Sequence, residues 1–182
     1  MLITRYAKVT MSLVLASFCL LVTFDNITDY GTNYLFVQHV LSMDTTFPGN
    51  ALMYRSITNP VLWQVAYALI IAAEAVTGIL FLAGAIRLFQ VRNASGAVFN
   101  QAKTLVIAAC TLAFLVWFFG FMVVAGEWFA MWQSQTWNGQ EAALRFYVAV
   151  LGVLIFVNQA DGDLPETAPE ASSPKRRRTD KK

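Results

Sequence analysis

Glu74 has the clearest potential for chemistry, because its carboxyl lies inside the long apolar run between Pro60 and Arg87. A run of that length predicts a transmembrane helix, which places Glu74 near the middle of the helix. A charge exposed to lipid at that depth is costly, so we expect the carboxyl to be protonated, paired or turned toward a polar cavity. Two interpretations stay open. The favoured one is a neutral carboxyl that hydrogen-bonds a neighbouring helix or subunit, and the other is a titratable site for transport.

A second group of candidates lies in the segment after the first apolar run. His39 is the only histidine of the chain, and Asp25 and Asp44 lie in the same segment. Imidazole and carboxylates together can ligate a metal ion, but a lone histidine is weak support for a metal site. Haem held by two histidines needs a second one. We therefore predict no metal and no cofactor.

A third group of candidates surrounds the end of the third apolar run. Glu127, Trp128 and Trp132 close that run, and Arg145 follows near the start of the fourth run. Aromatic residues at a helix end suit the membrane interface. The grouping predicts an aromatic belt in which Arg145 pairs with Glu127 or Asp25, and a headgroup or quinone pocket is the alternative.

Motifs of common enzymes do not occur in the chain. It contains no Gly-rich phosphate loop, no nucleophile elbow, no Cys-x-x-Cys and no His-Glu-x-x-His. Cys19 and Cys110 both lie in apolar runs, where a thiol behaves as a small buried hydrophobe. The sequence therefore favours a protein without catalytic activity.

The elements that position these residues follow from composition. With 57% hydrophobic and 13% charged residues, the chain lacks the polar surface of a soluble domain, in which about 25% of residues are charged. We predict an all-α membrane protein, a four-helix transmembrane bundle over residues 1–160. The four apolar runs predict helices over 7–25, 60–91, 102–132 and 139–158.

The connection between the first two helices, residues 26–59, is too long for a simple loop. Tyr30, Tyr34, Val37 and Leu41 recur at helical spacing and predict an amphipathic helix on the outer membrane surface. At the end of this connection, Asn59 followed by Pro60 is typical of a helix start.

Lysine and arginine concentrate on one side of the predicted bundle, whereas the opposite side has only Arg55 and Arg145. By the positive-inside rule, both termini are predicted to be cytoplasmic. The basic residues that carry this prediction, apart from the tail, are Arg5, Lys8, Arg87, Arg92 and Lys103.

The C-terminal tail, residues 161–182, is acidic at first and basic at the end, without apolar periodicity, and we expect it to be disordered. Its basic cluster resembles a nuclear import signal but needs no nucleic acid partner. Attraction to anionic lipid headgroups, about 1 kcal/mol per basic residue near the surface, explains the cluster more simply. The predicted lipid contacts are Lys175, Arg176, Arg177 and Arg178.

Three longer stretches carry a resemblance to a known family: Phe24–Tyr30, Val37–Phe47 and Gly126–Ser134. Over residues 1–160 the chain resembles bacterial predicted small integral membrane proteins, the domain of unknown function 2165. The resemblance implies an inner-membrane location and four crossings, and it implies no activity. All three stretches fall on the predicted outer side, which we hypothesise is the working face.

Three functions follow as hypotheses for a protein whose first partner is the lipid bilayer. The leading one is a non-catalytic accessory or structural subunit that contacts a larger membrane complex or further copies of itself. The alternative is a small oligomeric transporter or channel with Glu74 as its titratable site. A membrane redox or metal-binding subunit that uses His39, Asp44 and Glu127 is the third.

Overall fold

The computed structural model describes residues 2–165, and within them the chain is helical and contains no strand. Four helical segments are long and apolar enough to cross a membrane. This confirms the predicted all-α fold with a four-helix bundle. The segments are α1 (Leu2–Thr28), α3 (Pro60–Gln90), the joined segment Gly96–Trp128 and α6 (Gln140–Asn158). The joined segment consists of α4 (Gly96–Gln101), α5 (Thr104–Phe114) and the helix η2 (Leu115–Trp128).

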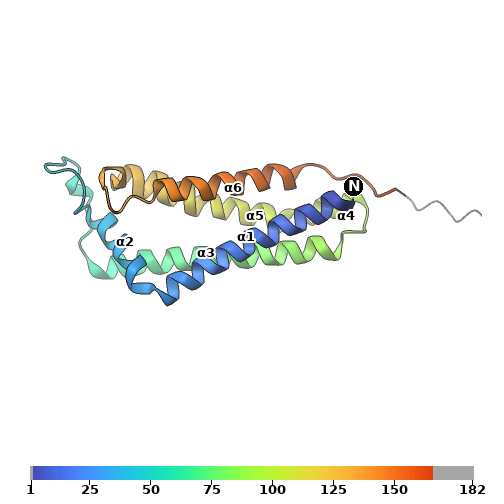
Figure 1. Ribbon diagram of the computed structural model, residues 1–182, viewed down its shortest axis with the longest axis horizontal. Helices are drawn as coiled ribbons and strands as arrows, with labels where there is room; N and C mark the ends of the chain where they lie inside the picture. Colours follow the sequence, from blue (N-terminus) through green and yellow to red (C-terminus); the bar gives the residue numbers. More distant parts are fainter. Residues whose placement is uncertain (1, 166–182) are drawn as a thin grey trace, which may run out of the picture.

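Consecutive spans alternate in direction, so the start of α1 and the end of α6 lie at the same end of the bundle (Figure 1). In that view α1 and α3 form one layer and α5 and α6 form the other. Along the first part of the third span, α3 packs closely on α5, but it makes only sparse contact with η2 further along. The two layers are therefore tightly joined at the end that holds the N-terminus and separate toward the other end.

Small residues allow the close packing of the joined end. A Cβ atom added to Gly84 of α3 would lie 2.7 Å from Cγ2 of Val106 on α5. At Gly78 an added Cβ would lie 2.8 Å from the side chain of Leu20 on α1. Only glycine lets the backbones approach this closely.

The start of α3 follows the predicted capping pattern. The side-chain oxygen of Asn59 accepts a hydrogen bond from the backbone N–H of Val61 at 2.9 Å, and Pro60 is the first helical residue. Proline fits there because that position needs no N–H donor.

The connection between α1 and α3 contains the helix α2 (Tyr30–Ser42), which packs on α3 at the end away from the N-terminus. Val37 and Val40 are the buried residues of α2. Together with the short helices η1 (Met53–Arg55) and η3 (Met131–Gln133), α2 forms a cap that consists of residues 29–59 and 128–139. A small hydrophobic core stabilises this cap, formed by Val40, Met43, Phe129, Ala130 and Met131.

The third span changes its helix type midway, which the sequence did not predict. From Leu115 to Trp128 it is a π-helix, and the Phe129 N–H bonds the carbonyl of Val124, five residues back, at 3.1 Å. It ends before the predicted residue 132, because Ala130 turns the chain with φ of 50°. Hydropathy is the same for an α-helix and a π-helix, so composition alone gives no signal. Such stretches are rare and frequently occur at functional sites.

Candidate functional site

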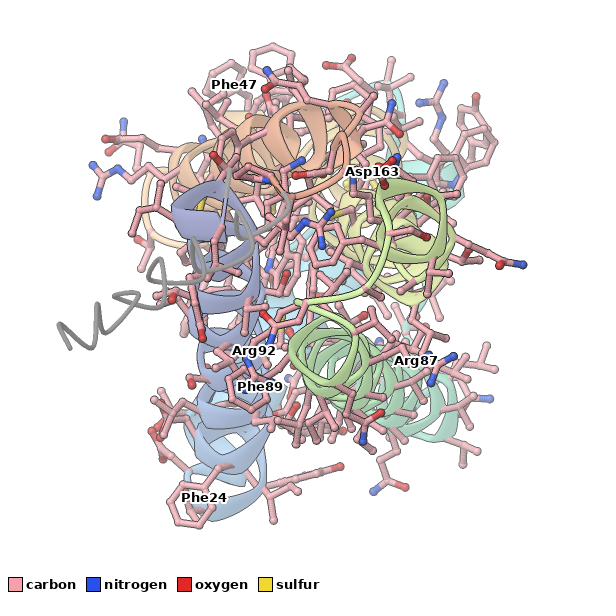
Figure 2. All side chains as sticks on the ribbon, turned by 90° about the vertical axis from the view of Figure 1, so that its right-hand side faces the viewer. Phe24, Phe47, Arg87, Phe89, Arg92 and Asp163 are labelled. Carbon is pink, nitrogen blue, oxygen red and sulfur yellow. The ribbon has the colours of Figure 1, made fainter. Side chains whose placement is uncertain are left out.

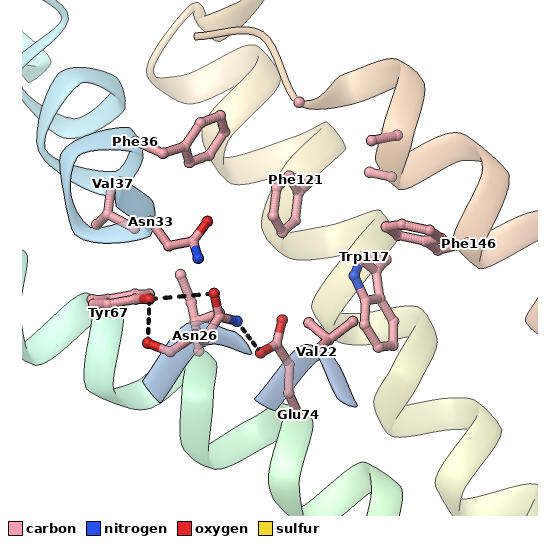
Figure 3. Close-up of a pocket in the computed structure, with 14 residues that line it drawn as sticks. Val22, Asn26, Asn33, Phe36, Val37, Tyr67, Glu74, Trp117, Phe121 and Phe146 are labelled. Atoms are coloured by element: carbon pink, nitrogen blue, oxygen red, sulfur yellow. Dashed lines mark hydrogen bonds between the residues drawn. The ribbon is translucent and has the colours of Figure 1, made fainter. Parts of the chain in front are cut away.

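A cavity of about 260 Å³ lies inside the bundle, between the two helix layers and beneath α2 (Figure 3). Residues from α1, α2, α3, η2 and α6 line it, so the packing of all four spans shapes it. The lining residues with polar side chains are Asn26, Asn33, Tyr67, Glu74 and Trp117. The apolar ones that close its walls are Val22, Phe36, Val37, Ile70, Phe121 and Phe146.

Glu74 is the only carboxyl among residues 2–165 that lines this cavity, and 2% of its surface is exposed. Asn26 of α1 donates a hydrogen bond from Nδ2 to Oε2 of Glu74 at 2.6 Å. The Tyr67 hydroxyl donates to the backbone carbonyl of Asn26 at 2.8 Å and lies 3.2 Å from its side-chain oxygen. Because Tyr67 and Glu74 are seven residues apart on α3, they lie on one face of the helix. Asn26 therefore joins both of them to α1.

Aromatic rings form the wall opposite Glu74. Trp117 of η2 is 2% exposed and packs edge-on against Phe146 of α6, with ring centroids 5.9 Å apart. Figure 3 shows its indole nitrogen on the cavity side of the ring. No hydrogen bond within residues 2–165 uses that N–H. This N–H therefore opens onto the cavity without a partner among the described residues, whereas the buried side-chain nitrogen without a partner in residues 2–165 is Nε of Arg5.

A second cavity, about 440 Å³ in volume and almost entirely apolar, adjoins the first. Both cavities share the side chains of Phe36, Val37, Ile70 and Phe121. The second one, which we call the apolar groove, lies between α3 and η2, where the two layers separate. A polar pocket and an apolar groove therefore meet at one set of side chains.

The opposite end of the bundle is closed by buried charges, which we call the clamp: Arg5, Lys8, Lys103 and Asp161. The Lys8 and Lys103 ammonium groups each lie 2.5 Å from Oδ2 of Asp161. Both also donate to the carbonyl of Gln159 at 2.7 Å. All three side chains are less than a tenth exposed. The clamp thereby fixes the chain just after α6 to α1 and to the third span.

Arg5 extends the clamp to the connection between α3 and α4. Its guanidinium is fully buried and donates to the carbonyls of Arg92 at 2.8 Å, Ala94 at 2.6 Å and Gly162 at 2.8 Å. It also lies over the ring of Phe99, 4.6 Å from the centroid. Figure 2 looks onto this end of the molecule, where Arg87 projects outward and Arg92 lies against Phe89.

Burial and the neighbouring ammonium groups shift the pKa of Asp161 in opposite directions. Burial alone would raise the pKa of the Asp161 carboxyl, but the hydrogen bonds from Lys103 and Lys8 outweigh burial and hold the pKa below its ordinary value of 3.8. The carboxylate is therefore charged at neutral pH and balances part of the positive charge of the clamp.

One family match covers all the residues that line the polar pocket. Residues 4–160 match a family described as predicted small integral membrane protein (DUF2165). The chain belongs to this family. No curated protein matches the chain, and neither does any solved structure. The chain is therefore an integral membrane protein that resides in a lipid bilayer, and the family assigns it no activity.

Within the family segment, the cap brings His39 and Asp44 together. Nδ1 of His39 lies 2.9 Å from Oδ2 of Asp44, and the imidazole stacks on Trp137 with centroids 4.7 Å apart. Neither of the other predicted acidic candidates, Asp25 and Glu127, joins this pair. Residues 2–165 contain no group of three or more potential ligands placed to hold a metal ion.

The predicted pairing of Arg145 with Glu127 or Asp25 is wrong. Arg145 pairs with Glu141, which lies one turn away on α6, and the side chains of Asp25 and Glu127 are exposed. Side chains four residues apart on a helix are neighbours, which favours the local partner.

The aromatic candidates of the cap lie at its surface. The guanidinium of Arg55 lies over the ring of Trp128, 4.6 Å from the ring centroid. Trp132 packs edge-on against Phe47, with ring centroids 5.7 Å apart, and both aromatic side chains of this pair are exposed.

The start of the predicted tail differs from the expectation. Asp161 and Gly162 belong to the clamp contacts, and the Asp163 carboxylate accepts a hydrogen bond from the Gly96 N–H at 2.6 Å. The predicted lipid contacts of the tail, Lys175, Arg176, Arg177 and Arg178, lie outside the described residues.

Sequence reasoning singled out Glu74 but missed Asn26, Tyr67 and Trp117. One signal was present, because Tyr67 and Glu74 are two helical turns apart and so share a face of α3. Asn26 gave no such signal, since its position near the end of an apolar run is typical of a residue at the membrane surface.

Proposed function

We propose that the protein is a non-catalytic membrane protein that binds a small amphiphilic molecule inside the bilayer. The observation that carries this proposal is the polar pocket around Glu74 joined to the apolar groove between α3 and η2. An amphiphile has a head that needs hydrogen bonds and a tail that needs apolar surroundings. The polar pocket offers hydrogen-bonding groups to the head, and the adjoining apolar groove offers apolar surroundings to the tail.

The dimensions and chemistry of the site support binding. Ligand pockets are typically about 300 to 1,000 Å³, mostly apolar, with a few polar groups that orient the ligand. The groove of about 440 Å³ lies within that range, and the polar pocket of about 260 Å³, which adjoins it, lies just below. Displacing water from these largely apolar walls would favour a bound amphiphile.

The wider role that we propose is that of an accessory subunit in a larger membrane complex. A subunit that holds an amphiphile for a partner needs no reactive group of its own. The cap supports this role, since it has its own hydrophobic core and presents exposed aromatic side chains, Phe47, Tyr54, Trp128 and Trp132.

We further propose that the protein lies in a bacterial inner membrane with both termini in the cytoplasm. The basic residues Arg87 and Arg92 at the clamp end support this orientation through the positive-inside rule. Reporter domains fused to either terminus should be active only in the cytoplasm. A periplasmic signal from either fusion would reverse the assignment.

A second candidate function is transport by an assembly of several copies, with Glu74 as the titrating group. The depth of Glu74 favours it, whereas the clamp weighs against it because its buried charges close one end of the bundle. Replacing Glu74 by Gln should abolish flux in liposomes if transport is the function. Unchanged flux would remove Glu74 from any such mechanism.

The test of the binding proposal compares the natural chain with two variants of α6. Ala142 and Ala149 are both exposed and lie two turns apart on α6, but Ala142 lines the polar pocket and Ala149 lines neither cavity. Phenylalanine at position 142 should fill the pocket, whereas phenylalanine at 149 should not. Each protein is purified in mild detergent, and its bound small molecules and copurified proteins are identified by mass spectrometry.

We expect an amphiphile at a stoichiometric ratio in the natural chain and in Ala149→Phe, and its loss in Ala142→Phe. The same lipids in equal amounts in all three proteins would contradict binding in the pocket. A defined protein partner in the same preparations would support the accessory role, and a single copy without any partner would count against it.

A further inference from the structure

We infer that the amphiphile bound in this pocket is an organic cation, an amine or quaternary ammonium head that carries an apolar tail. This inference rests on the proposed binding function and adds the chemical class of the ligand. It follows from three properties of the site: an uncompensated carboxyl, an aromatic wall and an apolar extension.

The charge of the site is the first argument. No Lys, Arg or His lines either cavity, and no ion pair within residues 2–165 involves Glu74. An ionised carboxylate without a countercharge is expensive at membrane depth, and a cationic head would supply that countercharge. An anionic head would instead meet the carboxyl group with repulsion or require its protonation.

The geometry of Glu74 agrees with this assignment. Asn26 engages Oε2, and Oε1 has no hydrogen-bond partner among the described residues. Figure 3 shows this second oxygen on the cavity side, between Asn26 and Trp117. The bond from Asn26, which Tyr67 in turn fixes, holds the carboxyl in this orientation. One carboxyl oxygen is thus free to receive a ligand while the other is fixed by the protein.

The aromatic wall is the second argument. Trp117, Phe121, Phe146 and Tyr67 all line the pocket that contains Glu74. The faces of aromatic rings attract ammonium groups. A quaternary ammonium cannot donate a hydrogen bond, so rings and one carboxylate suit it better than a set of hydrogen-bond acceptors. A neutral hydroxyl head would gain little from these rings.

The apolar groove is the third argument, because it provides for the rest of the ligand. Its lining consists of aliphatic, aromatic and small residues from α2, α3 and η2. Phe121 belongs to both cavities, so a tail attached to a head near Glu74 can continue past its ring into the groove. A single alkyl chain suits a groove of this shape between two helices.

The experiment measures binding of radiolabelled octyltrimethylammonium to the full chain in lipid nanodiscs, with empty nanodiscs as background. Unlabelled n-octanol and octyl sulfate, which keep the tail and change the head, serve as neutral and anionic competitors. Glu74→Gln keeps the shape of the side chain and its bond to Asn26 but removes the charge. Glu127→Gln removes an exposed carboxylate outside both cavities and is the matched control.

We expect saturable binding of octyltrimethylammonium that weakens about tenfold or more in Glu74→Gln, the range that loss of an ion pair and its orienting effect produces. Binding to Glu127→Gln should equal that of the natural chain. The two competitors should displace the cation at least about tenfold less well than the unlabelled cation does.

Two results would overturn the inference in distinguishable ways. If n-octanol or octyl sulfate competes as well as the cation, the ligand is an amphiphile of another class and the proposed function stands. If octyltrimethylammonium does not bind saturably to the natural chain, the inference is wrong, and direct binding of radiolabelled n-octanol and octyl sulfate then tests the binding function, which is wrong as well if neither binds saturably. The competition series needs no variant, so it decides between the classes even if Glu74→Gln does not fold.

Discussion

The two ends of the bundle differ in the partners that their buried charged groups have. At the clamp end, Lys8 and Lys103 share Asp161 and the carbonyl of Gln159, so each ammonium has protein partners. Nε of Arg5 has no partner there, but the other two nitrogens of its guanidinium bond three carbonyls. At the pocket end, Glu74 has a partner for one oxygen only, and the Trp117 N–H has none among the described residues. Buried polar groups that are satisfied stabilise a fold, whereas buried groups with spare bonding capacity indicate a place for something else.

The difference extends to packing. Gly84 brings α3 and α5 close together near the clamp. Around the pocket, η2 and α3 separate, and α2 covers the gap while leaving the groove beneath it. The clamp end is therefore tightly packed, whereas the pocket end leaves space for a ligand.

The largest expected effect comes from breaking the clamp with Asp161→Asn. This change would leave two buried ammonium groups without their carboxylate, which typically costs about 3–5 kcal/mol. Unfolding in detergent, followed by circular dichroism, should show a loss of stability of this order. Asp25→Asn, at an exposed carboxyl, is the control and should unfold like the natural chain. If Asp161→Asn is equally stable, the charges do not hold this end together.

Acid should weaken the clamp in a defined pH range. Because the folded protein holds the pKa of Asp161 below 3.8, the stabilisation by Asp161 is complete above that value and is lost as pH falls through the lowered pKa. The difference in stability between the natural chain and Asp161→Asn should therefore be constant near neutral pH and shrink under strong acid. A difference that shrinks already above pH 5, about one unit above the ordinary pKa, would contradict the assignment of this carboxylate.

The sequence predicts the transmembrane fold more readily than it predicts the clamp or the pocket. Hydropathy alone predicts four spans, and Asn59 with Pro60 predicts the start of α3, because both signals are local. The clamp was missed because Arg5, Lys8 and Lys103 were interpreted as residues at the membrane surface, while their partners follow α6, 151 residues beyond Lys8 in the case of Gln159. Contacts over such separations leave no local pattern.

The sequence predicted only part of the pocket. Glu74 stands out because a carboxyl in an apolar run is rare, and this is a local signal. Trp117 is one of several aromatic residues in its run, and nothing in the sequence separates a cavity wall from a helix that faces lipid. The π-helical stretch that sets the position of Trp117 is equally hidden, since it depends on backbone hydrogen bonding.

The pocket itself can be weakened at Asn26. Asn26→Ala removes the donor to Glu74 and leaves a buried carboxyl unsatisfied, which typically costs about 1–3 kcal/mol. Asn33→Ala is a matched control, because Asn33 lines the same cavity but is not the residue that donates to Glu74. Unfolding curves should show the loss for Asn26→Ala alone. Equal effects of the two variants would mean that the bond to Glu74 contributes nothing of its own.

Two glycines test the contrast in packing, and one of them, Gly120, should give the smallest effect. An added Cβ at Gly84 would lie 2.7 Å from Val106 Cγ2 and 3.0 Å from the Val106 backbone nitrogen, whereas at Gly120 its nearest contact is 3.7 Å. We expect Gly84→Ala to destabilise the protein by about 1–3 kcal/mol, because the helices must move apart. Gly120→Ala, beside the groove, should be neutral or stabilising by up to about 1 kcal/mol, because alanine restricts the unfolded chain. Unfolding of the two variants side by side measures the difference. If Gly120→Ala is as harmful as Gly84→Ala, the groove is closed in the folded protein, and the pocket end is as tightly packed as the clamp end.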